Sequence, residues 1–146
     1  MEGILSQITA ANYGQYLHLK NDEVRMVLNI IAECGGPSLD TLMKMNDRDF
    51  HPYLEEFNRQ VEDAGKVEYT DVGYTVNLSH PFEGPFGTVE TVVMRKPVQG
   101  DRVGSFRNEY LKQKAILASV SNLTVSEIDC LPIGDFITMA DLVSVQ

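Results

Sequence analysis

The side chains that could perform chemistry are few and widely spaced. His18, His51 and His80 lie 33 and 29 residues apart and form no metal-ligand pattern with nearby carboxylates. Zinc sites need ligands gathered at short, regular spacings. Cys34 and Cys130 form no CxxC or Cys/His pattern, so we expect two reduced thiols that are buried or half-buried. The sequence therefore predicts no metal and no cofactor.

Motifs that bind nucleotides or activate a nucleophile are also missing. The chain has no GxGxxG, no P-loop and no GxSxG, and its GPFG stretch is typical of a turn. The acidic pairs Glu55-Glu56 and Glu62-Asp63 stand in a helical context, where a solvent-facing side is the simplest interpretation. We therefore expect a protein that is not an enzyme.

Length, composition and charge limit the class of protein that this chain can be. A chain of 146 residues with 43% apolar residues is long enough for one compact body with a real core. No segment reaches the roughly 18 apolar residues of a membrane span, and the start of the chain does not resemble a secretory signal. The net charge of -9 argues against binding nucleic acid, which needs a surplus of Lys and Arg. We expect a cytoplasmic protein.

The N-terminal part of the chain, which could help to position a site, is predicted to be mainly helical. Residues 3–19 fit both a helix and a strand, so their structure stays open. Asn21 or Asp22 can cap an amphipathic helix that Gly35 and Gly36 end.

Two further helices are expected before the chain changes its periodicity. Ser38 can cap a short helical segment. A longer helix should follow, with Asp47 or Asp49 near its start, Pro52 in its first turn and Gly65 as its stop.

From residue 67 the period becomes that of a strand. Val72, Tyr74, Val76 and Leu78 alternate with small or polar residues, as in a strand with one buried face. The prolines and glycines of residues 80–87 should end the pairing and bend the chain. Residues 89–95 should then return antiparallel as the second arm of a hairpin.

The last third reads as helical again. We expect a helix that opens at Gly100 or Asp101 and includes Val103 and Phe106 in its apolar face. Thr124 and Glu127 have the spacing of a T-x-x-E capping box, and a final helix should start near Pro132.

The chain also contains a candidate repeat. Shifted by 86 positions, residues 30–54 align without a gap on residues 116–140, and Asp49-Phe50 falls on Asp135-Phe136. Such a match arises either by chance between short amphipathic helices or by duplication. The predicted fold class is α+β, mostly helical with one antiparallel β-hairpin near the middle, with duplication of the helical unit left open. Residues 1–70 would form a mainly helical region and 71–146 a hairpin with three helices, together one body.

Residues 73–143 carry a family resemblance. Their hairpin, helix and capped-helix order is similar to the small tail assembly chaperones of Mu-like and related contractile-tailed phages. The positions that match the family pattern are Leu78, Pro81, Val89, Arg95, Pro97, Gly100, Asp101, Leu123, Thr124, Ile128, Leu131 and Asp135. The chain departs from the pattern by about 70 extra N-terminal residues.

The resemblance implies a role without catalysis in the host cytoplasm. Family members are thought to cover the long, helical, aggregation-prone tape measure protein until tail-tube subunits polymerise around it. The implied partner is a phage tape measure protein, with tail tube or baseplate proteins and a second copy of the chain as further candidates. The alternative is a structural tail or baseplate component. An acidic charge would keep a coated filament soluble.

Apolar positions of the C-terminal helices are the first candidates for the client groove, although ordinary core packing is the simpler explanation for each of them. Met94 and Met139 suit varied partners because methionine is flexible. Arg95 matches the family pattern, and its alternative role is an ion pair with Asp101 or Glu90. The complete candidate set is Met94, Arg95, Leu117, Val120, Ile128, Leu131, Phe136, Met139 and Leu142.

Overall fold

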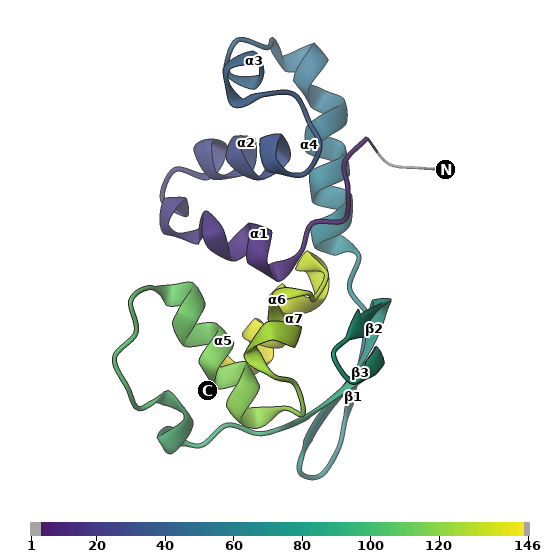
Figure 1. The fold of residues 1–146 in the computed structure, drawn as a ribbon, viewed down its shortest axis with the longest axis vertical. Coiled ribbons are helices and arrows are strands. Elements are labelled where there is room, and N and C mark those ends of the chain that lie inside the picture. The colour runs from purple at the N-terminus through teal and green to yellow at the C-terminus, as the bar shows by residue number, and fades with distance from the viewer. Residues whose placement is uncertain (1–3, 145–146) are drawn as a thin grey trace.

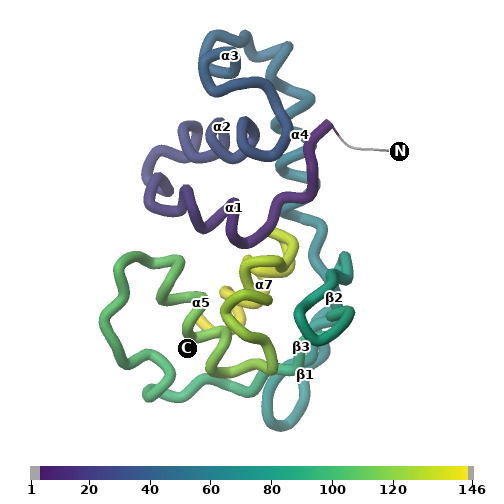
Figure 2. The backbone as a smooth tube through the Cα atoms, in the orientation of Figure 1, coloured from purple at the N-terminus to yellow at the C-terminus, as the bar shows by residue number. Residues whose placement is uncertain are grey.

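A computed structural model describes residues 4–144, shown as a ribbon in Figure 1 and as a backbone tube in Figure 2. Helices α1–α4 occupy the upper part of Figure 1, and α5–α7 with the sheet occupy the lower part. The predicted α+β class, mostly helical, is confirmed. Within the described residues no helix is long and apolar enough to cross a membrane.

The N-terminal helices begin at side-chain caps. Residues 3–19, for which the sequence did not distinguish a helix from a strand, contain α1 (Ala10–Gln15) and a 3-10 turn (Leu17–Leu19). The predicted caps Asp22 and Ser38 are confirmed: they accept backbone N–H bonds at the starts of α2 (Glu23–Glu33) and α3 (Leu39–Met43). Gly35 has φ of 95°, a left-handed conformation that glycine adopts readily after a helix.

Helix α4 (Asp47–Glu62) starts where predicted but contains its proline deeper than expected. Asn46 caps it by accepting the backbone N–H of Asp49 at 2.8 Å. Pro52 is the sixth residue of the helix and so lies in its second turn, which corrects the first-turn prediction. Because proline has no N–H, this turn lacks one backbone hydrogen bond.

The sheet has one strand more than the predicted hairpin. Strands β1 (Lys66–Tyr69), β2 (Gly73–Gly84) and β3 (Gly87–Arg95) pair antiparallel in the order β1-β2-β3. Strand β2 continues through Pro81 to Gly84, so residues 80–84 do not end the pairing as expected. The register shifts between Asn77 and Phe82, which places Pro81 where the ladder is interrupted and its missing N–H is not needed.

The helix expected to open at Gly100 or Asp101 starts later. A short 3-10 turn (Gln99–Arg102) is followed by an irregular loop, and α5 (Glu109–Val120) begins after its cap Asn108. Gly104 has φ of 135°, which breaks a helical path. Val103 therefore lies in the loop with 78% of its surface exposed, against the predicted place in an apolar helix face.

The last two helices agree with the sequence. Thr124 and Glu127 form the predicted capping box at α6 (Val125–Asp129): Thr124 Oγ1 accepts the Glu127 N–H, and Glu127 accepts the Thr124 N–H. The final helix α7 (Ile133–Ser144) begins directly after Pro132.

Two apolar clusters form the core. One lies between the sheet and helices α5–α7, and the other lies among the N-terminal helices. The N-terminal segment joins them: Ile8 O accepts the Ile133 N–H at 2.9 Å, and Ala10 N donates to Leu131 O at 2.7 Å. On its other side Ile8 N donates to the Gln60 side chain, which is only 4% exposed.

The helices of the candidate repeat coincide in their bounds. Shifted by 86 positions, α3 (Leu39–Met43) falls on α6 (Val125–Asp129), and the first residues of α2 and α4 fall on those of α5 and α7. In each triplet the first helix contacts both others. The matching bounds are what a duplicated unit predicts, although they do not by themselves separate duplication from chance.

Candidate functional site

Most of the predicted partner-binding residues lie in the core. Their positions correspond to the core-packing alternative, so they form no exposed groove in this structure. Leu142 is half-buried, and Arg95 keeps 46% of its side chain exposed. The residues that are 3% exposed or less are Met94, Leu117, Val120, Ile128, Leu131, Phe136 and Met139. They are buried because the sheet covers one side of the C-terminal helices and α1 covers another.

Arg95 forms the predicted ion pair with Asp101. Its two terminal nitrogens bind the two Asp101 oxygens at 2.7 and 2.8 Å. Asp101 also accepts from the Ser119 hydroxyl at 2.6 Å and from the Val98 N–H at 2.8 Å. The Arg95 guanidinium, followed by these donors, holds the Asp101 pKa well below its usual range. The pair ties the end of β3 to α5, so Arg95 has a structural role.

Asp135 connects the sheet to the start of α7. Its carboxylate is fully buried and accepts the N–H of Gly65 at 2.6 Å, the N–H of Ser79 at 3.0 Å and the Ser79 hydroxyl at 2.8 Å. It stands in the first turn of the helix, where a negative charge is favourable. This matched family position therefore fixes the packing of β2 on α7.

Helix α1 covers a face made by α5 and α7. The Tyr110 ring packs on Phe136 with centroids 5.5 Å apart, and Tyr13 packs on the same Phe136 at 6.1 Å. Gly14 lies against the Tyr110 ring, since a Cβ there would stand 2.3 Å from it. Burial, followed by the hydrogen bond to Asp129, raises the Tyr110 pKa above its usual value. This ring is a packing element that stays neutral at physiological pH.

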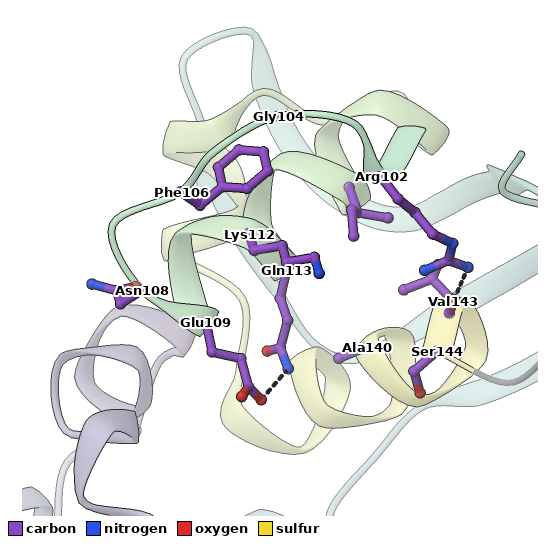
Figure 3. A pocket seen from close by; sticks show the side chains of 11 residues that line it. Arg102, Gly104, Phe106, Asn108, Glu109, Lys112, Gln113, Ala140, Val143 and Ser144 are labelled. Atoms are coloured by element: carbon purple, nitrogen blue, oxygen red, sulfur yellow. Dashed lines mark hydrogen bonds between the residues drawn. The ribbon is translucent and has the colours of Figure 1, made fainter. Parts of the chain in front are cut away.

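A groove with a volume of about 590 Å³ lies between the loop 103–108, α5 and α7. We call it the α5/α7 groove; Figure 3 shows its lining side chains. Phe106, Ala140 and Val143 give it an apolar side, and Lys112 and Arg102 bring positive charge. Arg102 is held in place because it donates to the Val143 carbonyl at 2.6 Å. Sequence reasoning missed this groove because it assigned Phe106 to a helix face.

A second, smaller groove lies between α2 and α4. It has a volume of about 260 Å³ and is lined by Glu23, Val24, Val27, Phe50 and Leu54. We call it the α2/α4 groove. Its lining is mainly apolar, which suits a protein or peptide better than a polar metabolite.

Side chains that could perform chemistry remain separate. His80 contacts Asp63 at 2.6 Å and His51 contacts Glu55 at 3.4 Å, in both cases on the surface. Among the described residues no group of three or more His, Cys, Asp or Glu could hold a metal ion.

Both cysteines are free thiols. Cys34 is buried, and burial raises its pKa to about 11, so its thiol stays protonated and unreactive. Cys130 is exposed, against the expectation of a buried or half-buried thiol, because it ends α6 in a surface turn.

Comparison with known proteins gives no relative. No family model, no curated protein and no solved structure matches the chain.

Proposed function

We propose that this protein is a tail assembly chaperone of a contractile-tailed phage. It binds the tape measure protein in the host cytoplasm and keeps it soluble until the tail tube polymerises around it. It makes and breaks no covalent bond. The tape measure protein is the partner, and the surfaces that meet it are apolar grooves between helices.

The observation that supports the proposal best is the role of the polar residues in the matched pattern. Arg95 and Asp101 form a two-bond ion pair, and Thr124 caps α6. Asp135 accepts three hydrogen bonds that join the sheet to α7. A pattern of surface residues could match by chance, whereas these residues hold the hairpin and helices together. The resemblance therefore concerns residues that specify an architecture.

We propose that the α5/α7 groove, in the C-terminal half of the chain, contacts the tape measure protein. Its apolar side can cover an aliphatic or aromatic side chain of a client helix, and Lys112 can pair with an acidic residue beside it. An open groove of this size makes a modest interface. Modest interfaces, repeated along a filament, give strong coverage that is still released when tube subunits compete.

The net charge of -9 supports the same role. A client filament covered by acidic proteins repels other filaments, which opposes aggregation. The side chains left exposed in the structure include large apolar ones such as Phe86 at 88% and Val72 at 75%. Single exposed apolar side chains are common on folded proteins, and the acidic net charge opposes self-association.

Co-expression tests the proposal. We expect a tape measure gene beside the gene for this chain. The product of that gene is produced with and without this chain, and its soluble fraction is measured. We expect a clear rise in soluble client when the two chains are present together. An equally insoluble client in both cases would refute the proposal. Recovery of this chain as a stoichiometric part of purified particles would instead identify a structural tail or baseplate component.

A further inference from the structure

The two helix triplets offer a comparison within one chain. Because α2, α3 and α4 begin 86 positions before α5, α6 and α7, residues 23–58 of the first triplet have counterparts at positions 109–144. Glu23 corresponds to Glu109, Val24 to Tyr110 and Phe50 to Phe136. The α2/α4 groove therefore corresponds in part to the face that α1 covers, since Tyr110 and Phe136 pack on α1. Its other part corresponds to the α5/α7 groove, which Gln113 and Ala140, the counterparts of Val27 and Leu54, help to line.

On the second triplet the covering segment makes three kinds of contact. Gly14 of α1 lies flat against the Tyr110 ring. Tyr13, one residue before it, packs on Phe136. Lys20, beyond the end of α1, forms an ion pair with Glu109. A small residue, an aromatic ring and a cation are thus the features that this face recognises.

On the first triplet the corresponding face is open. Val24 is 68% exposed, whereas its counterpart Tyr110 is only 7% exposed. Phe50 and Leu54 are half-buried at the floor of the groove. Glu23 lines the groove and has no ion-pair partner among the described residues. Residues 1–70 carry 12 acidic and 6 basic side chains, so the surroundings favour a cationic occupant.

We propose that the α2/α4 groove binds an amphipathic helix of the client, which rests on the proposed function. The helix presents a small residue against Val24, an aromatic residue one position earlier against Phe50, and a basic residue further along for Glu23. Groove binding of an amphipathic helix by such anchors is a common recognition mode. It gives the chaperone a second contact site, distinct from the α5/α7 groove.

A second copy of this chain is a poorer occupant. Among the described residues, α1 is the segment seen to cover such a face, and it is already held by its own chain. Ala10 N donates to Leu131 O at 2.7 Å, and Gly14 is buried against Tyr110. To enter the groove of another copy, α1 would have to leave a core that contains fully buried side chains.

Two measurements test the proposal with the full chain. The first repeats the co-expression assay with Val24→Asp, which puts a charge in the groove, and with Val72→Asp as a control. Val72 is a similarly exposed valine, at 75%, in the turn before β2. We expect Val24→Asp to lose most of the gain in soluble client and Val72→Asp to keep it.

The second measurement uses nuclear magnetic resonance and needs no client. Isotope-labelled protein is titrated with an acetylated peptide of residues 8–21, which contains the α1 contacts. We expect amide shifts in α2 and α4 around Val24 and Phe50. Binding should be about tenfold weaker in Val24→Asp, the loss expected for one apolar anchor, and unchanged in Val72→Asp.

The outcomes separate the two proposals. If the wild-type chain does not keep the client soluble, the proposed function is wrong and the titration alone decides whether the groove binds a helix. If the wild-type chain and Val24→Asp work equally well, the groove proposal is wrong and the function stands. Peptide shifts confined to α5 and α7 would also contradict it. A wild-type dimer that Val24→Asp abolishes in sedimentation would show that the occupant is a second copy.

Discussion

Replacing Asp135 with alanine should destabilise the protein strongly. The side chain is fully buried and accepts hydrogen bonds from the Gly65 N–H, the Ser79 N–H and the Ser79 hydroxyl. Alanine leaves all three donors without their acceptor. It also separates β2 from the start of α7, so the sheet loses its polar connection to the helices.

The size of the stability loss in Asp135→Ala can be estimated from the three hydrogen-bond donors that lose their acceptor. A buried donor left without a partner costs about 1–3 kcal/mol. Ser79 is only half-buried, so water can reach part of the site, and the lower end of the range applies to each donor. We therefore expect the free energy of unfolding to fall by about 3 kcal/mol, a large part of the roughly 5–15 kcal/mol of a typical domain.

Urea unfolding followed by circular dichroism gives this free energy, and the chain supplies a matched control. Asp49 occupies the corresponding position in the first turn of α4, but its side chain is 58% exposed. Asp49→Ala should lower the unfolding free energy by only about 0.5 kcal/mol, from weaker interaction with the helix dipole. The reasoning is refuted if the two variants have the same stability.

Three further changes test other contacts. Gly14→Ala should lower the unfolding free energy by about 1–3 kcal/mol because its methyl group meets the Tyr110 ring, whereas Gly100→Ala, with no neighbour within 4 Å of its Cβ position, should leave urea unfolding nearly unchanged. Thr124→Ala should lower it by about 1 kcal/mol through loss of the capping box; an unchanged urea midpoint would contradict this. The Asp101 pKa is lower in the folded chain, so its stabilisation is present above the ordinary value of 3.8 and is lost as the pH falls further; melting curves of wild type and Asp101→Asn should therefore converge in acid, and a constant difference would contradict the ion pair.

Local signals in the sequence predicted helix starts well. Asp22, Ser38 and Thr124 each cap the helix they were expected to cap, because a cap depends on only a few neighbouring residues. The same local reasoning missed β1, whose residues 66–69 are mostly exposed and gain their structure from pairing with β2. A short, mostly exposed edge strand lacks the alternating apolar pattern by which a strand is predicted from sequence.

Contacts between distant residues could not be predicted. The apolar residues of α5–α7 suit both a binding face and a core, with core packing the simpler explanation, and the positions of the sheet and of α1 show that they are core. Asp101 was one of two ion-pair partners considered for Arg95, the other being Glu90, and this short-range contact is present because only six residues separate Arg95 from Asp101. The approach of Asp135 to Gly65 and Ser79 spans 70 and 56 residues, and nothing in the local sequence indicates it.

The grooves illustrate the same limit. Phe106 was expected in a helix, and only the loop that follows Gly104 brings it to the α5/α7 groove. The α2/α4 groove could have been suspected from the repeat, because Val24 stands where the other triplet has Tyr110. A small side chain in place of an aromatic one leaves space at the helix surface.

The soluble fraction of the tape measure protein, measured by quantitative immunoblot after co-expression with this chain, tests the central claim most directly. The account predicts a soluble complex of the two proteins that elutes together in size-exclusion chromatography. A client that stays in the pellet at every expression ratio, while this chain alone remains folded and soluble, would contradict it.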